Sequence, residues 1–257
     1  MTTASATNAD RASLENLIEQ VDVELDVLHP GGLDITRELA EHCRIGHDTY
    51  VLDVAAGTGE TACYLAGRFG ARVVGIDASA RMVERAQRKA AERALSIDFR
   101  TADAIHLPFA DATFDAVISE CTLCLLDKTR ALAEMVRVAK PGGYVGMHDI
   151  CWRSDTPDDV KQRLVELEGE RPETMSGWQG LFAAAGLVAV EVVDKAALIP
   201  TWVRDIRRGL GLGGQVRIFA KVLRRWGWRG LRDVLESERI FQSRYTGYAI
   251  IVGRKPP

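Results

Sequence analysis

Residues 51–59 of the 257-residue chain read Val51-Leu52-Asp53-Val54-Ala55-Ala56-Gly57-Thr58-Gly59. The first half is short, apolar and rich in β-branched residues, which is typical of a buried strand. The two glycines that follow allow the backbone to turn tightly and to approach a ligand closely. A helix is expected to begin directly after them, and a helix N-terminus favours a carboxylate or a phosphate. The stretch therefore predicts a strand, a glycine turn and a helix that bind a small ligand together.

Strands and helices alternate on the carboxyl side of this stretch. The pattern predicts helices over 60–68, 80–94, 128–139 and 178–185, strands over 72–76, 97–101, 114–119, 144–148, 187–193 and 245–252, and a turn over 140–143. Such alternation is typical of βαβ units. We expect an α/β fold with a doubly wound, mostly parallel sheet of the Rossmann-like kind.

Two segments stand outside the alternation and carry opposite charge. Residues 1–49 contain predicted helices over 12–28 and 34–43 and have a net charge of −7, whereas residues 197–242 have a net charge of +6. We expect a helical arm at 1–49, a core at 50–196, a helical insertion at 197–242 and a final core strand within 243–257. Because opposite charges attract, the arm and the insertion are predicted to meet as a cap over the strand ends.

The composition excludes several classes of protein. A net charge of −3 argues against binding nucleic acid through bulk charge. The chain contains no apolar run of the roughly 20 residues needed to span a membrane, and its first residues lack the features of a secretory signal, so we expect a cytoplasmic protein. Its five cysteines are then expected to be free thiols. The basic, Trp-containing run at 224–229 leaves peripheral contact with a membrane open, beside the alternative of a cap with an aromatic-lined pocket. The oligomeric state is not indicated.

Acidic residues follow the predicted strands at the edge where ligands bind in such sheets. Asp77 lies eighteen residues beyond Gly59, a suitable distance for a carboxylate that accepts both hydroxyls of a ribose. The glycines alone also fit the relaxed dinucleotide fingerprint, because Ala62 follows Gly59 at the right spacing. The pattern predicts an adenosine site and, by itself, leaves a nicotinamide dinucleotide open.

The remaining motifs separate these alternatives. From Tyr50 to about Val193 the sequence resembles class I S-adenosylmethionine-dependent methyltransferases, of the type 11/25-like group that acts on small molecules. The resemblance rests on residues 51–59 and on Val74-Gly75-Ile76-Asp77-Ala78-Ser79 with Met82, Asp103-Ala104, Leu107-Pro108-Phe109, Phe114-Asp115-Ala116-Val117 and Arg137-Val138-Ala139-Lys140-Pro141-Gly142-Gly143. It implies seven strands with the last antiparallel, S-adenosyl-L-methionine as cofactor and S-adenosyl-L-homocysteine as product.

The resemblance also implies roles for individual residues. Asp53 would fix the glycine loop and the amino group of the cofactor, Asp77 would hold the ribose, and Met82 would pack on the adenine. The full implied cofactor set is Asp53, Ala55, Gly57, Gly59, Asp77, Ala78, Met82, Asp103, Ala104 and Ser119. The family usually has glycine at the position of Ala55, where we expect a methyl group to fit after a small backbone shift.

Methyl transfer from a sulfonium is an in-line displacement, so the protein must align the acceptor and remove any proton that it carries. The candidate bases at strand ends are Glu120, His148 and Asp149, with His29 in the turn of the arm as a fourth. No spacing of metal-ligating residues indicates a metal site. We expect an enzyme that methylates the O, N or C atom of a small organic acceptor.

Two other functions stay open at this point. Residues 119–128, which include Cys121 and Cys124, resemble the corresponding stretch of arsenite methyltransferases, in which a cysteine after the fourth strand helps to bind trivalent arsenic. Cys63 lies near the place of a second such cysteine, whereas a further one is lacking, and small buried thiols are common in cores. The alternatives are thus a thiophilic acceptor such as arsenite, or a non-catalytic protein that binds S-adenosylmethionine.

Overall fold

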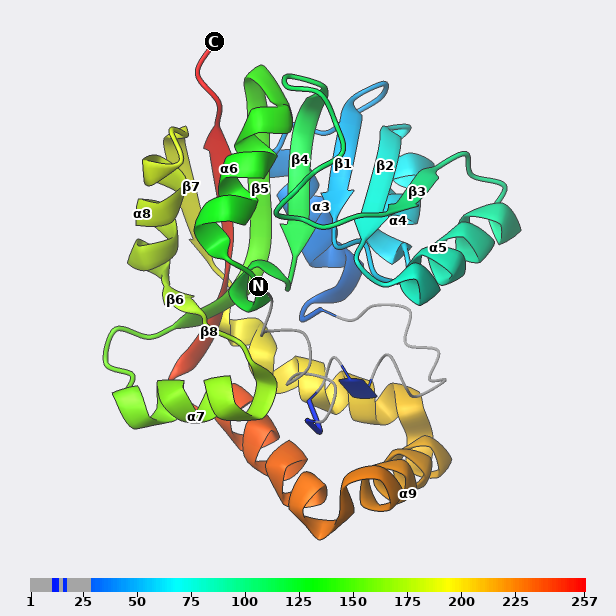
Figure 1. The fold of residues 1–257 in the computed structure, drawn as a ribbon, viewed down its shortest axis with the longest axis vertical. Helices are drawn as coiled ribbons and strands as arrows, with labels where there is room; N and C mark the ends of the chain where they lie inside the picture. The colour runs from blue at the N-terminus through cyan, green and yellow to red at the C-terminus, as the bar shows by residue number, and fades with distance from the viewer. Residues whose placement is uncertain (1–10, 14–15, 18–28) are drawn as a thin grey trace.

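The structure, a computed structural model, describes residues 11–13, 16–17 and 29–257. Within residues 198–210, Arg208 is the one residue whose side chain it describes. The helix predicted over 12–28 lies almost entirely outside the described residues. A central sheet has the strand order β3-β2-β1-β4-β5-β8-β7 (Figure 1). Its strands are β1 (Tyr50–Val54), β2 (Arg72–Asp77), β3 (Asp98–Thr101), β4 (Phe114–Glu120), β5 (Ala139–Trp152), β7 (Val188–Asp194) and β8 (Thr246–Arg254).

Strands β1 to β5 are parallel, and β8 runs antiparallel to both β5 and β7. The prediction of a doubly wound, mostly parallel sheet is therefore confirmed. The short strand β6 (Glu173–Thr174) pairs with β5 away from this path and was not expected.

Helices cover both faces of the sheet (Figure 1). The helices are α3 (Gly32–His42), α4 (Glu60–Phe69), α5 (Ala80–Glu92), α6 (Lys128–Val138), α7 (Asp158–Glu168), α8 (Met175–Ala184) and α9 (Ile199–Phe241), with short 3-10 turns η1 (Leu123–Leu125) and η2 (Ala196–Leu198). Side-chain caps define three of their starts: Ser79 accepts the backbone N–H of Met82, Asp127 that of Arg130 and Thr174 that of Gly177.

The alternation of side chains along each strand divides the core into two layers. Leu52 and Val54 of β1 pack with α6 and α8, where Trp178 and Phe182 are completely buried. Val51, which precedes Leu52, packs on the opposite face with residues of α3, α4 and α5. Because both faces are covered, the exposed edge at the carboxyl ends of the strands is left for a ligand.

In the second half of the core, the strand predicted over 144–148 is confirmed but its limits were wrong, and so was the turn predicted over 140–143. The strand expected over 144–148 is β5, which starts before it and continues beyond it, because β8 pairs with it from Tyr144 to Trp152. The expected turn at 140–143 is a local irregularity within β5, where Gly142 has a φ of 79° and the register against β4 shifts. Helix α7 was not predicted, because its 11 residues are mostly charged and only Leu164 and Leu167 among its apolar residues are buried.

Helix α9 occupies the predicted insertion and lies beyond the carboxyl ends of the parallel strands (Figure 1). Gly211 and Gly227 have non-helical backbone angles, so α9 is a series of helical segments and not one rod. The described part of the arm contacts it, because Leu17 packs in a small apolar cluster with Val222 and Trp226. This contact is apolar, whereas the prediction was based on charge.

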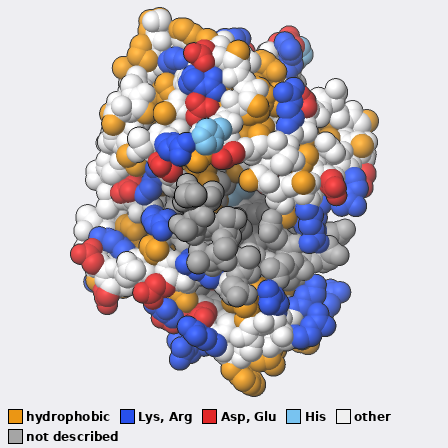
Figure 2. All heavy atoms as spheres, in the orientation of Figure 1, with side chains coloured by type: hydrophobic (Ala, Val, Ile, Leu, Met, Phe, Trp, Pro, Cys, Tyr) orange, Lys and Arg blue, Asp and Glu red, His pale blue; other side chains and the backbone are white. Residues whose placement is uncertain are grey.

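The outer surface of α9 combines basic and apolar side chains. Figure 2 shows Lys and Arg side chains gathered at the lower right of the molecule, on the side of α9. Leu212, Val216 and Trp228 of α9 are 83%, 66% and 73% exposed. No helix among the described residues is both long enough and apolar enough to cross a membrane.

Candidate active site

A cavity of about 460 Å³ lies at the carboxyl edge of the sheet, and α9 and β8 contribute Phe241 and Tyr248 to its wall. Most of the residues predicted for the site line this cavity. They are Asp53, Ala55, Gly57, Asp77, Ala78, Met82, Asp103 and Ala104 from the cofactor set, and His29 and Glu120 from the candidate bases.

Four predicted site residues lie outside the lining. Gly59 precedes α4 as its N-cap, and Ser119 is 1% exposed beside Glu120 on β4. His148 and Asp149 lie inside β5, where they are 0% and 1% exposed. They were expected after the end of that strand, and because β5 is longer, they are part of the interior.

The glycine turn is held by the second strand. The Asp77 carboxylate accepts the backbone N–H of Gly57 and that of Ser79, each at 2.9 Å. Gly57 and Gly59 have φ values of 51° and 78°, a region that favours glycine. Ala55 has a φ of 62°, so the loop keeps a glycine-like conformation there. We expected a small backbone shift at Ala55, but the residue instead keeps a left-handed conformation that is strained for alanine.

Three carboxylates, those of Asp53, Asp77 and Glu120, line one side of the cavity. Burial raises the pKa of Asp53 well above its usual value, and the negative charges of Glu120 and Asp77 raise it further. Its Oδ2 atom is buried and has no hydrogen-bond partner in the described part of the chain. Such a group is suited to a cationic ligand, because a nearby positive charge would stabilise all three carboxylates.

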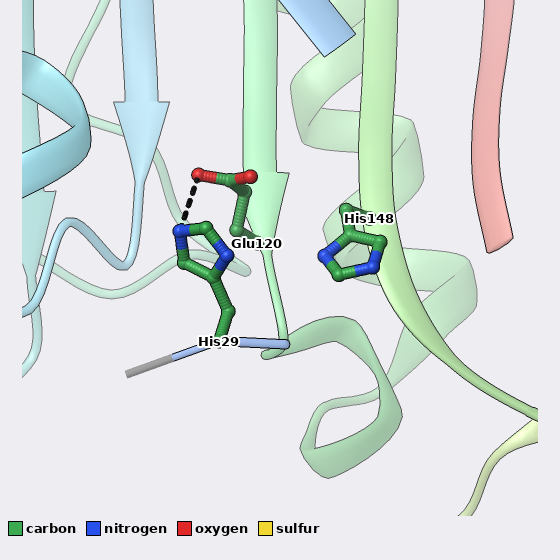
Figure 3. Close-up of side chains that lie close together, drawn as sticks. All are labelled: His29, Glu120 and His148. Carbon is green, nitrogen blue, oxygen red and sulfur yellow. Dashed lines mark ion pairs between the residues drawn. The ribbon is translucent and has the colours of Figure 1, made fainter. Parts of the chain in front are cut away.

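Glu120, at the end of β4, connects three segments of the chain. Its Oε2 atom accepts the hydroxyl of Thr61 at 2.6 Å, and Thr36 lies 3.1 Å from the same oxygen. His29, which precedes α3, places Nε2 3.3 Å from this Oε2 (Figure 3). A carboxylate that accepts the Nε2 proton leaves the lone pair of a neutral imidazole on Nδ1. Thr36 and Thr61 were not predicted, because neither stands in a motif.

The remaining wall of the cavity is mainly apolar, although the carboxylate of Glu170 also belongs to it, near Cys121 and Tyr248. Leu125 and Leu126 follow β4, Phe241 ends α9, and Tyr248 lies on β8. Tyr248 and Phe241 are 4% and 5% exposed, and burial raises the pKa of the Tyr248 hydroxyl well above its usual value. The sequence analysis did not predict Tyr248 or Phe241 as site residues. The antiparallel pairing of β8 with β5 brings them to this edge, and that pairing leaves no local pattern.

Burial favours the thiol over the thiolate at the two cysteines near the site. Cys121 lines the cavity, while Cys124 is buried behind it. Burial raises the pKa of both well above the usual value, and the charge of Asp149 adds to this effect. Because thiolates are the form that binds soft metal and metalloid ions, these two residues are poorly suited to a thiophilic acceptor.

The structure also groups three residues that the sequence did not. His29, Glu120 and His148 each offer one ligand atom within 4.8 Å of those of the other two (Figure 3). They come from the turn before α3, the end of β4 and the interior of β5. The sequence analysis predicted no metal site, because these positions are far apart along the chain.

The chain is similar to known methyltransferases and to a cyclase of known structure. A family model for a methyltransferase domain matches residues 52–147. O-methyltransferase cnsE of Penicillium expansum is 32% identical over 187 residues, which are 71% of this chain and 68% of that protein. Methyltransferase GfsG of Streptomyces halstedii is 34% identical over 178 residues, or 66% of this chain and 64% of that protein. The crystal structure of the [4+2]-cyclase SpnF matches with a TM-score of 0.70 at 25% identity, covering 87% of this chain and 81% of that one.

These relatives do not favour the two alternatives of a thiophilic acceptor and a non-catalytic protein. The match to residues 52–147 includes the glycine loop, Asp77, Asp103 and Glu120, which are the residues that line the cavity. Because the chain is also 32% identical to an O-methyltransferase and covers 68% of its length, it belongs to the methyltransferase domain family.

Proposed function

We propose that this protein transfers a methyl group from S-adenosylmethionine to a small organic acceptor bound in the cavity at the carboxyl edge. The observation that supports this most directly is the order of side chains along the edge. Asp103 follows β3, Asp77 ends β2 and Asp53 lies on β1. Leu125, after β4, and Tyr248, on β8, belong to the other side of the sheet order. An acidic half and an apolar half thus share one cavity.

The acidic half fits the cofactor. Asp53 and Asp77 present carboxylates, which suit an ammonium group and ribose hydroxyls, and Met82 lines the same half with an apolar side chain. The unpartnered Oδ2 of Asp53 gains a partner when a cation binds beside it. When it is bound, S-adenosylmethionine supplies a methyl group on a positively charged sulfur.

The apolar half fits the acceptor. Phe241 and Tyr248 are rigid, largely buried side chains that favour an acceptor with a flat or apolar body. They lie beyond Glu120 along the edge of the sheet, so the acceptor approaches the methyl group from that side. Because α9 contributes Phe241, the insertion takes part in selecting the acceptor.

Glu120 and His29 are the candidate bases that reach the cavity, and we assign them to the acceptor. Glu120 orients His29 through Nε2, which leaves Nδ1 to take the proton that the acceptor loses. His148 and Asp149 do not line the cavity, so neither contacts the acceptor in this arrangement.

Calorimetric titration with S-adenosylhomocysteine tests the cofactor half. The wild type should bind saturably, and Asp77→Asn should weaken binding by about 1 to 3 kcal/mol. The Asn side chain has one oxygen that accepts hydrogen bonds, whereas the Asp77 carboxylate has two. Asp98→Asn, on exposed β3 away from the cavity, is the matched control and should bind like the wild type. Absence of binding by the wild type, or saturable binding of a nicotinamide dinucleotide, would overturn the proposal.

A further inference from the structure

His29, Glu120 and His148 converge on one space at the inner end of the cavity. Figure 3 shows the ring of His148 facing the ring of His29, with the Glu120 carboxylate beside them. The two ring centroids are 5.9 Å apart and the rings are nearly perpendicular, at 75°. Two of the three residues line the cavity, and His148 lies behind them with 0% exposure.

The nitrogens that face this space have no other role in the described part of the chain. Both ring nitrogens of His148 and Nδ1 of His29 are buried without a hydrogen-bond partner there. An unpartnered buried polar group is unfavourable, and one such nitrogen from each of the two rings, facing the same space beside a carboxylate, indicates a missing ligand. In Figure 3 the nitrogen of His29 that does not meet Glu120, Nδ1, lies on the side of His148.

The carboxylate has one oxygen that is held more loosely. Thr61 and the His29 ring meet Oε2 of Glu120, while among the described residues Oε1 has only the longer contact of 3.3 Å with the Thr36 hydroxyl. Oε1 therefore keeps lone pairs for a further partner. Two imidazole nitrogens and one carboxylate oxygen with remaining open positions form a donor set typical of divalent first-row transition ions.

We propose that His29, Glu120 and His148 bind one divalent transition ion of the Fe²⁺ or Zn²⁺ class at the inner end of the cavity. Its open coordination positions face the cavity, because His29 and Glu120 both line it. The site itself is independent of methyl transfer, whereas its role in that reaction rests on the proposed function.

In that role, the ion binds an oxygen of the acceptor and fixes its orientation. A bound cation lowers the pKa of a hydroxyl that coordinates it, so the acceptor would lose its proton to solvent water and be held as an anion before methyl transfer. His29 and Glu120 then coordinate the ion with their lone pairs and do not take the proton of the acceptor. The site therefore selects acceptors that carry a hydroxyl or enol oxygen on an otherwise apolar body.

Titration of the metal-stripped, full-length protein with Co²⁺ tests the site. Calorimetry and the visible absorption of the bound ion monitor the titration. The wild type should bind one equivalent, and His29→Gln and Glu120→Gln should each weaken binding by at least about tenfold. His42→Gln is the control, because His42 also contacts a carboxylate, Nδ1 to Oε2 of Glu191 at 3.0 Å, but at the surface and with no third ligand. It should bind Co²⁺ like the wild type.

Equal Co²⁺ binding by the wild type, His29→Gln and Glu120→Gln would overturn the inference, as would a wild type that binds no stoichiometric ion. Circular dichroism of each variant verifies that it is folded. A parallel titration with S-adenosylhomocysteine separates the two proposals. If S-adenosylhomocysteine binds and Co²⁺ does not, the metal site is wrong and the methyltransferase function stands. If Co²⁺ binds and S-adenosylhomocysteine does not, the metal site stands and the proposed function is wrong.

Discussion

Asp149 and His148 are neighbours on β5 that burial affects in opposite ways. Asp149 accepts backbone N–H groups from Ile150 at 2.8 Å and Cys124 at 3.2 Å, yet burial raises the pKa of its carboxyl to about 6. Burial lowers the pKa of His148 well below its usual value, and His29 and Lys195 add to this effect. Burial thus opposes charge on both residues in the interior of the strand.

Asp149 should therefore make the stability of the protein depend on pH. A pKa raised from 3.8 to about 6 favours the folded state while the group is protonated, and this contribution is lost as the pH rises through 6. Between pH 4.5 and 7.5 the free energy of unfolding should fall by about 2 kcal/mol from this group alone. Chemical denaturation of the wild type and Asp149→Asn at both pH values measures the difference. Parallel pH dependence of the two proteins would contradict this assignment.

The start of α4 depends on two glycines that differ in their surroundings. A Cβ atom at Gly59 would lie 2.7 Å from Cβ of Ala86 and 2.9 Å from Cζ of Phe99, whereas one at Gly57 would meet no atom within 4 Å. Both residues have a positive φ, so alanine is strained at either position. Gly59 thus permits close packing between α4, α5 and β3, while Gly57 leaves room for a ligand.

Thermal or chemical unfolding of two alanine variants should separate these roles. Gly57→Ala should lower the free energy of unfolding by about 1 to 2 kcal/mol from backbone strain alone. Gly59→Ala should lower it by a further 1 to 3 kcal/mol, roughly, because the added methyl group is also overpacked. Equal destabilisation by the two substitutions would show that packing at Gly59 is not tight.

At this scale the sequence predicted the elements whose signals are local. The glycine loop and Asp77 were found because a strand, a turn and a helix follow one another within 30 residues of chain. The limits of β5 were missed because His148 and Asp149 read as polar residues beyond a strand end. Only pairing with β8, about 100 residues later, makes them interior. Tyr248 and Phe241 escaped prediction for the same reason, since long-range pairing leaves no local pattern.

The arm, α7 and α9 form a connected layer over the strand ends. Leu17 packs with Val222, which is 1% exposed, and Arg163 of α7 forms ion pairs with Asp233 and Glu236 of α9. We expect this layer and the sheet to unfold together, because Phe241 of α9 belongs to the main core cluster.

A carboxylate in this layer should destabilise the whole molecule. Val222→Asp buries an unpaired charge and should lower the free energy of unfolding by about 3 kcal/mol or more. Val216→Asp, on the same helix at 66% exposure, is the matched control and should change it by less than about 0.5 kcal/mol. Calorimetric scans should show one transition that moves to lower temperature for Val222→Asp. A separate early transition, with the main one unmoved, would mean that the layer melts independently of the sheet.

The two ends of the α9 segment meet at one place on the sheet. The backbone N–H of Lys195, just after β7, donates to the carbonyl of Tyr248 on β8 at 2.6 Å. The chain thus leaves and returns between adjacent strands, so a segment of different length or sequence can be grafted between them without altering the glycine loop or the acidic half of the cavity. On the proposed function, in which α9 helps to select the acceptor, we expect chimaeras that exchange this segment between relatives to differ in acceptor specificity.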